Sequence, residues 1–162
     1  MSGTTYDDDN RYIGDPPPFG ANAEFEADVQ CALTNTAPVL ITAAADVATA
    51  LARRIHRNSL NRRGPFVTLD CARLNLPEQL DAAFDSATPT GTVFLRDVDK
   101  LAPAIQAQLY SRIAPLGVRV IAATSVSLLI AAAHGTFDER LFYRLNQIHL
   151  VAPLVNSPAG AA

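Results

Sequence analysis

The sequence predicts an α/β fold: a three-layer sandwich around a mainly parallel five-stranded sheet. Short apolar runs, typical of strands covered on both faces, alternate with longer segments whose apolar residues recur every three or four positions. Because parallel strands are joined by right-handed crossovers, the connecting helices should cover both faces of the sheet. The length of 162 residues fits one domain with a substantial core and is too short for two.

Five segments are predicted as strands, and all except the last are nearly continuous apolar runs. In chain order they are Val39–Thr42, Phe66–Leu69, Thr92–Leu95, Val118–Ala123 and Gln147–Val151.

The connections carry helix signals. Before the first strand, apolar residues at four-residue spacing predict a short amphipathic helix, formed by Phe25, Val29 and Leu33. After it, Asp46 can cap a helix that ends at Asn58 and has one apolar stripe of Val47, Leu51 and Ile55. Pro77 and Pro103 suit the first turns of two further helices, and Gly135 can end a helix over residues 128–134.

Composition bounds the organisation of the chain. Residues 1–20 are acidic and proline-rich and are predicted to be a flexible leader, residues 21–154 the folded domain, and residues 155–162 a flexible tail.

A net charge of −3 provides no overall positive field for nucleic acid. There is no secretion signal, and the longest apolar run is too short to span a membrane, so we expect a cytoplasmic protein. Cys31 and Cys71 are predicted to be buried free thiols.

The turn between the first strand and its helix has an unusual composition. A glycine-rich loop at this point of a strand–helix unit, with a lysine, commonly binds nucleotide phosphates. Here the turn is Ala43-Ala44-Ala45-Asp46 and lacks glycine, lysine, serine and threonine. The sequence therefore predicts the strand–turn–helix unit of a phosphate site without the residues that bind phosphate.

The other groups of polar and charged residues are better explained by structural roles than by metal binding or catalysis. The three histidines show no metal spacing, and no serine has an adjacent histidine–acid arrangement, so we predict no metal and no catalytic residue. The basic run over residues 53–63 is interpreted as a solvated helix face. Arg96 and Lys100 flank Asp97 and Asp99, which predicts local salt bridges.

Six strings, in order, resemble the AAA+ domain of sigma-54-dependent transcription activators, the bacterial enhancer-binding proteins. They are VLIT at 39–42, ARRIHRNS at 52–59, GPFVTLDCARL at 64–74, GTVFLRDVDKL at 91–101, VRVIAATS at 118–125 and FDERLFYRLN at 137–146. The resemblance covers most of residues 21–154 and implies a P-loop NTPase (AAA+) core.

The resemblance also implies that the nucleotide site is degenerate. The phosphate-binding Walker A loop matches Ala43, Ala44, Ala45, Asp46, Val47 and Ala48, with its lysine position at Ala48. Losing two or three charge-assisted bonds costs about 5 kcal/mol, or about three to four orders of magnitude in affinity. The Walker B acids, which hold Mg²⁺ and position water, match Arg96 and Asp97, so a cation replaces the metal-side carboxylate.

At two functional positions this chain has the side chain that is typical of the family. Thr124 matches the sensor segment, although Ser125 follows where asparagine is usual. Of the two trans-acting arginines, the first position is Asp138 and the second is Arg144. A strand-end role for Thr124 and a salt-bridging role for Arg144 are the simpler explanations.

The resemblance further implies missing segments. The GAFTGA loop that contacts sigma-54 would lie between Leu76 and Thr90, where one short helix and a turn fill the gap. Neither the helical lid domain nor a helix-turn-helix is expected after the fifth strand.

These observations predict a non-hydrolysing pseudo-AAA+ module, not an enzyme. It would act in transcription regulation through protein–protein contact, with no cofactor, no direct DNA binding, and an intact sigma-54 activator as the possible partner. One alternative is a regulatory domain that binds ATP and Mg²⁺ weakly. Another is a decayed fragment or docking domain that uses the acidic leader. The sign of the regulation, the partner and the oligomeric state stay open.

Overall fold

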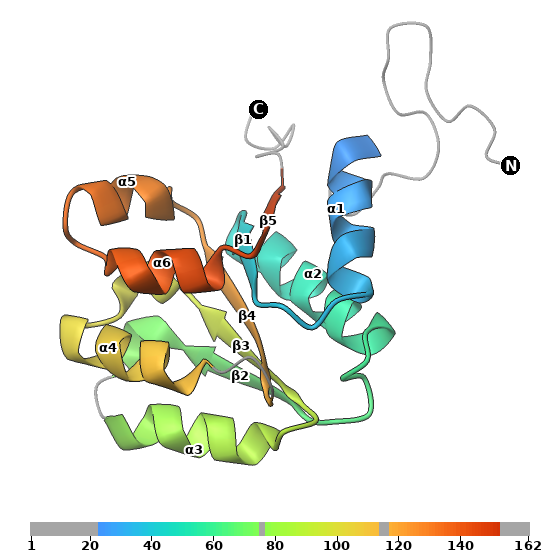
Figure 1. Ribbon diagram of the computed structural model, residues 1–162, viewed down its shortest axis with the longest axis horizontal. Coiled ribbons are helices and arrows are strands. Elements are labelled where there is room, and N and C mark those ends of the chain that lie inside the picture. Colours follow the sequence, from blue (N-terminus) through green and yellow to red (C-terminus); the bar gives the residue numbers. More distant parts are fainter. Residues whose placement is uncertain (1–22, 75–76, 114–116, 153–162) are drawn as a thin grey trace, which may run out of the picture.

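The computed structural model describes residues 23–74, 77–113 and 117–152, so the predicted leader and tail lie outside the described residues. Its centre is a five-stranded sheet in the order β2-β3-β4-β1-β5, and every neighbouring pair is parallel (Figure 1). The strands are β1 (Val39–Thr42), β2 (Phe66–Asp70), β3 (Thr92–Arg96), β4 (Arg119–Thr124) and β5 (Ile148–Val151). Each predicted strand is confirmed to within one residue at either end.

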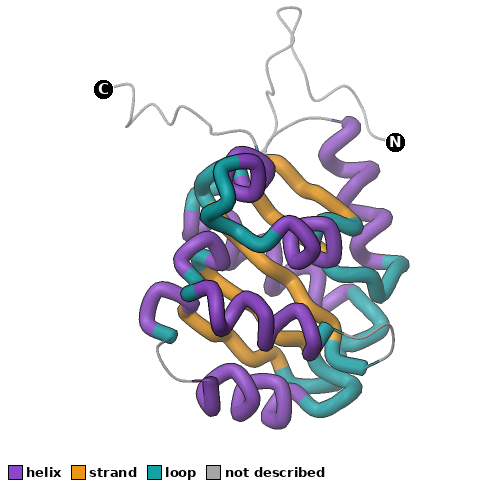
Figure 2. The backbone as a smooth tube through the Cα atoms, turned by 60° about the vertical axis from the view of Figure 1, so that its left-hand side comes forward, coloured by secondary structure: helices purple, strands orange, loops and turns teal. Residues whose placement is uncertain are grey.

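Helices cover both faces of this sheet, which confirms the three-layer sandwich (Figure 2). One face packs against α1 (Ala23–Leu33) and α2 (Ala45–Asn58). The other packs against α3 (Pro77–Ala87), α4 (Pro103–Arg112), α5 (Leu128–Ala133) and α6 (Glu139–Leu145). None of the helices in the described ranges is long and apolar enough to cross a membrane.

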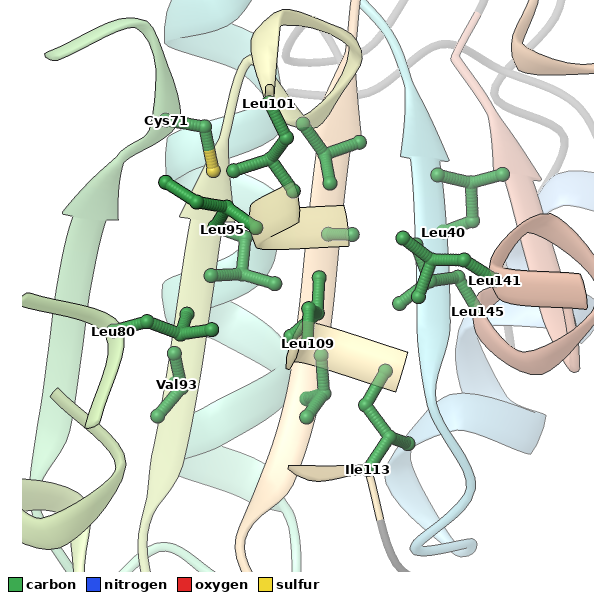
Figure 3. Packing of buried hydrophobic residues seen from close by; sticks show 14 of the residues in the cluster. Leu40, Cys71, Leu80, Val93, Leu95, Leu101, Leu109, Ile113, Leu141 and Leu145 are labelled. Carbon is green, nitrogen blue, oxygen red and sulfur yellow. The ribbon is translucent and has the colours of Figure 1, made fainter. Parts of the chain in front are cut away.

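The two hydrophobic clusters follow the alternation of side chains along the strands. Val93 and Leu95 of β3 face α3 and α4, where they lie near Leu80 and Leu109 (Figure 3). Phe94, between them in sequence, belongs to the cluster under α1 and α2. Every strand residue from Thr92 to Leu95 is buried, as expected for a strand covered on both faces.

The helix boundaries confirm most of the predicted signals. Pro77 and Pro103 stand at the first positions of α3 and α4. Gly135 follows the end of α5 and has a φ of +78°, a left-handed conformation that glycine adopts without strain. Two short 3₁₀ turns, η1 (Cys71–Arg73) and η2 (Val98–Lys100), follow β2 and β3.

Two predictions about local structure are wrong, and one helix is absent from the predicted elements. Asp46 does not cap α2, because the helix begins one residue earlier at Ala45 and its N-cap is Ala44, which makes no side-chain bond. Cys31 is exposed on α1, whereas Cys71 is buried as predicted and burial raises the pKa of its thiol. The helix α6 was not expected; it is short and begins at the capping residue Asp138.

The turn after α2 crosses the turn before β3 at very close range. Asn61 donates a hydrogen bond from Nδ2 to the carbonyl oxygen of Gly91, 3.0 Å away. A β-carbon on Gly64 would overlap the carbonyl group of Thr90, and one on Gly91 would lie 2.6 Å from the carbonyl oxygen of Pro65. Only residues without a side chain allow these backbones to approach so closely.

Polar groups are buried at the same end of the sheet. His56 of α2 is 7% exposed, and its Nδ1 lies 2.9 Å from Oγ1 of Thr92. Arg119 is 2% exposed; Nε donates to the carbonyl oxygen of Ala37 at 3.2 Å, while both terminal nitrogens have no hydrogen-bond partner within the described residues. Burial lowers the pKa of Arg119 to about 10.

The burial of His56 predicts a stability that decreases in mild acid. Burial lowers its pKa below the ordinary value of 6.5, so the unfolded chain binds the proton more readily than the folded one. The free energy of unfolding should therefore decrease as pH falls below about 6.5. The pKa of His149 is lowered in the same direction, again mainly by burial.

Urea titrations between pH 7.5 and 5.5 measure this dependence. His56→Gln should remove part of the pH dependence of the unfolding free energy, and His149→Gln serves as the comparison for the second histidine. An unchanged dependence in His56→Gln would contradict the prediction.

Candidate nucleotide site

The predicted site residues meet where the carboxyl ends of three parallel strands face the start of α2. A cavity at this edge is lined by Ala43, Ala45, Ala48, Arg96, Asp97 and Thr124, all of them predicted. Ligands of open α/β sheets bind at this edge in general. The cavity measures only about 10 Å³, which is room for at most one water molecule.

The backbone of the strand–helix turn is held by the sheet. The N–H of Ala43 donates to the carbonyl oxygen of Thr124 at 3.0 Å, which ties the end of β1 to the end of β4. Ala48, at the position that matches the lysine, is 1% exposed and belongs to the hydrophobic cluster under α2. The lysine position of the loop is thus part of the core.

Two of the amide groups in the first turn of α2 are already bonded within the protein. Free N–H groups at a helix N-terminus attract anions. Here the N–H of Val47 donates to the carboxylate of Asp46 at 2.9 Å, and the N–H of Ala48 donates to the carbonyl oxygen of Ala44 at 2.8 Å. A carboxylate at this end of the helix repels a phosphate group.

Arg96 ends β3 and Asp97 follows it, and both residues line the cavity. The salt bridges predicted between Asp97 or Asp99 and the flanking cations are not formed. Within the part of the chain that the structure describes, neither acid makes an ion pair with Arg96 or Lys100. Asp97 has a φ of +53°, a left-handed conformation that aspartate tolerates better than most residues. Asp99 instead accepts a hydrogen bond from Thr124.

The hydroxyl group of Thr124 is fully used by the protein. It donates to Oδ1 of Asp99 at 2.8 Å and accepts the N–H of Val126 at 3.2 Å. The residue is 2% exposed. Sequence reasoning missed Asp99 as the partner, although its place directly after β3 put it at the same edge of the sheet.

Arg144 is not part of this cavity. It lies at the opposite end of the sheet, beside the amino ends of β1, β4 and β5. Nη1 donates to the carbonyl oxygen of Ile113 at 2.7 Å, and Nη2 donates to the hydroxyl oxygen of Tyr110 at 3.2 Å. The guanidinium carbon lies 4.5 Å from the centre of the Tyr110 ring. These contacts join α6 to α4, a structural role, although the predicted salt bridge is not among them.

Asp138 also has a structural role. Its carboxylate accepts the N–H groups of Arg140 and Leu141 at 2.8 and 3.1 Å, which caps α6. The bond from Leu141 is the main reason that the pKa of Asp138 is lowered. An arginine here would leave these amides without their cap.

Phe94 is a lining residue that sequence reasoning missed. Its ring closes the cavity from the α2 side of β3 and stacks on Phe66, with 5.9 Å between ring centres. The two-residue period of a strand was the available signal, because it places Phe94 on the same face as Arg96. Among the described residues, no group of three or more histidine, cysteine or acidic side chains could hold a metal ion.

Curated relatives share the sequence pattern. The regulatory protein AtoC of Escherichia coli K12 is 34% identical over 135 residues, which cover 64% of this chain and 29% of AtoC. The nitrogen fixation protein AnfA of Azotobacter vinelandii is 33% identical over 133 residues, covering 64% of this chain and 25% of AnfA. The chain therefore spans less than a third of the length of these relatives.

Solved structures share the fold. NtrX of Brucella abortus in complex with ATP superposes with a TM-score of 0.69 at 22% identity, covering 80% of this chain and 36% of NtrX. The P-loop NTPase domain of a sigma-54 transport activator from E. coli gives a TM-score of 0.66 at 20% identity, covering 82% and 94%. The sheet and helices described above are thus those of a P-loop NTPase domain.

The family model of the sigma-54 interaction domain matches residues 21–154. This match covers the whole sheet and both helical layers, and it agrees with one relative named as a putative sigma-54-dependent transcriptional regulator, UacR of E. coli K12. The chain therefore belongs to the sigma-54 interaction domain family.

Proposed function

We propose that this domain does not hydrolyse ATP and acts in transcription regulation through contact with another protein. The observation that carries the proposal is the small size of the cavity at the carboxyl edge of the sheet. It measures about 10 Å³, with Ala48 where a lysine would bind phosphate and Arg96 where a carboxylate would bind Mg²⁺. Neither a triphosphate nor its metal ion finds ligands there.

The charges around the cavity support the same proposal. Asp46 lies at the first turn of α2, where a phosphate would need free amides. The guanidinium of Arg96 repels a divalent cation at the mouth. Thr124 and Arg144, the two family-like side chains, are engaged in internal hydrogen bonds.

An exposed apolar surface supports contact with a protein. Val126, Leu129 and Ile130 are 46%, 58% and 57% exposed, and no charged residue occurs from Ser125 to Phe137. Ser125 also lines the cavity, so this surface begins at the former nucleotide edge. Interface cores are depleted of charge in the same way. An intact sigma-54-dependent activator is the partner that we propose.

Titration with a fluorescent ATP analogue, with and without Mg²⁺, tests the first half of the proposal. We expect no binding up to about millimolar concentration, because the lost charge-assisted bonds weaken a micromolar site by about three to four orders of magnitude. NtrX of B. abortus, whose structure contains ATP, is the positive control. Micromolar binding by this chain would overturn the proposal.

Capture of a purified, intact sigma-54-dependent activator tests the second half. Leu129→Glu combined with Ile130→Glu should abolish capture and leave the unfolding free energy nearly unchanged, since both side chains are exposed. Leu60→Glu is the matched control, because Leu60 is 71% exposed on a different surface. Equal capture by both variants would contradict the proposed surface.

A weak ATP-binding regulatory domain is the second candidate function. The observation in its favour is the fold shared with NtrX, whose structures contain ATP or ADP. The same titration with the fluorescent ATP analogue tests this candidate. A dissociation constant below millimolar that is observed only with Mg²⁺ would support it.

A further inference from the structure

A basic patch that the proposed function does not use lies at the end of α2 and in the turn that follows. We call Arg53, Arg57, Arg62 and Arg63 the basic patch; all four side chains are exposed. The sequence between Asp46 and Asp70 contains no acidic residue, although the whole chain has a net charge of −3. This stretch of the chain therefore carries an excess of positive charge.

The charges of the basic patch are not neutralised by the fold. Within the described ranges, none of its four arginines forms an ion pair. Arg53 lies over the ring of Phe66 at 5.0 Å, and Arg62 donates to the carbonyl oxygen of Ser59 at 3.2 Å.

Four other arginines of the domain have acidic partners. Arg54, on the same helix, pairs with Glu26 of α1 at 3.1 Å. The other pairs join Arg73 to Asp70, Arg112 to Asp81 and Asp85, and Arg140 to Asp138. Arg96, Arg119 and Arg144 also form no ion pair within the described residues, but they are buried or partly buried, whereas the four arginines of the basic patch are exposed.

We propose that the acidic segment of residues 1–20 binds the basic patch of the same molecule. This segment carries four aspartates and one arginine: Asp7, Asp8, Asp9, Asp15 and Arg11. Its charge is opposite to that of the patch. Leu60, 71% exposed between Arg57 and Arg62, gives the surface an apolar centre, and the segment contains Tyr6 and Ile13. This combination suits a peptide better than a nucleic acid backbone.

The segment is long enough to reach the patch. Asp9 precedes the start of α1 at Ala23 by 14 residues, which span up to about 46 Å when extended. The 14 residues of α2 measure only about 21 Å. The pair between Glu26 and Arg54 links α1 to α2.

Covalent attachment favours this occupant over a separate partner. A short tether gives an effective concentration of about millimolar, so even a weak peptide–patch contact is populated within one molecule. The contact should be salt-dependent, because the Debye length shrinks from about 10 Å at 0.1 M salt to about 3 Å at 1 M. This inference does not depend on the proposed function.

Paramagnetic relaxation in the full chain tests the proposal. A spin label is attached at Ser2→Cys in a Cys31→Ser background, since Cys31 is exposed and Cys71 is buried. At 0.1 M salt the amide signals of Arg57, Arg62 and Arg63 should lose at least about half of their intensity, and they should recover at 1 M salt. No loss at 0.1 M salt would overturn the proposal.

Two charge variants and a control make the result specific. Asp7→Asn, Asp8→Asn and Asp9→Asn together should abolish the intensity loss without changing the folded domain. Arg57→Gln, Arg62→Gln and Arg63→Gln together should do the same, whereas Arg73→Gln with Arg140→Gln should have no effect. If the intensity loss persisted in the triple aspartate variant or in the triple arginine variant, the contact would not use these charges, and the proposal would be overturned.

Two further measurements identify other occupants. Intensity loss in a ¹⁵N-labelled chain that carries no spin label, mixed with a spin-labelled ¹⁴N chain, would show contact between two copies. No loss within one molecule, together with shifts of the same amides on addition of a 20-base-pair DNA duplex, would show a nucleic acid surface. Either result would overturn the proposal.

Discussion

Gly91→Ala should lower the free energy of unfolding by about 3 kcal/mol or more, to the point of preventing folding. The new β-carbon would overlap the carbonyl oxygen of Ala87 and lie 2.6 Å from that of Pro65. Both obstacles are backbone atoms, which cannot turn aside as a flexible side chain can. Gly64→Ala should be equally damaging, because it would meet the carbonyl group of Thr90. Urea denaturation of each variant measures the loss.

Gly135→Ala is the matched control for this prediction. Gly135 has a φ of +78° but no atom within 4 Å of the position of a β-carbon. Its replacement adds backbone strain without overlap and should cost only about 1–2 kcal/mol. A loss in Gly91→Ala no larger than that in Gly135→Ala would show that the two turns can separate.

Arg144→Ala should lower the free energy of unfolding by about 2–4 kcal/mol. The substitution removes the hydrogen bonds to Ile113 and Tyr110 and the contact with the Tyr110 ring. Hydrogen bonds of charged groups contribute about 1.5–3 kcal/mol and a cation–ring contact about 0.5–2 kcal/mol. Because the loss arises inside one molecule, it should appear in the purified protein without any partner.

Two further substitutions identify the cause of that loss. Arg144→Lys should recover only part of the stability, since an ammonium group cannot reproduce the planar two-sided contact. Arg140→Ala should cost less, because the Arg140 side chain is 69% exposed and reaches the same ring at 5.0 Å. A fully stable Arg144→Ala that had lost partner binding would instead show that Arg144 acts on another subunit.

The sequence predicted the sheet well because parallel strands covered on both faces leave a strong signal. Each of the first four strands is a compact apolar run, and burial of these runs drives the fold. Helix α6 was harder to predict. It has only seven residues, and its start depends on the cap formed by Asp138. Asp46 failed as a cap because α2 begins one residue before it.

The positions of the site residues were predictable, but their partners were not. The resemblance to a known family placed Ala48, Arg96 and Thr124 at one edge of the sheet, where the structure brings them together. The bond between Thr124 and Asp99 depends on how η2 turns after β3, which no local pattern encodes. The predicted salt bridges are not formed within the described residues, and Asp99 instead accepts the hydrogen bond from Thr124.

The strand order has a consequence for the time at which this protein can fold. β1 ends at Thr42, yet its neighbours in the sheet are β4, which begins at Arg119, and β5, which begins at Ile148. During synthesis the first strand must therefore wait, with one hydrogen-bonding edge free until β4 is made and the other free until β5 is made, more than a hundred residues later. Contacts of such sequence separation form slowly and expose apolar segments to association with other chains. Nascent chains halted before β5 should depend on chaperones, whereas completed chains should not.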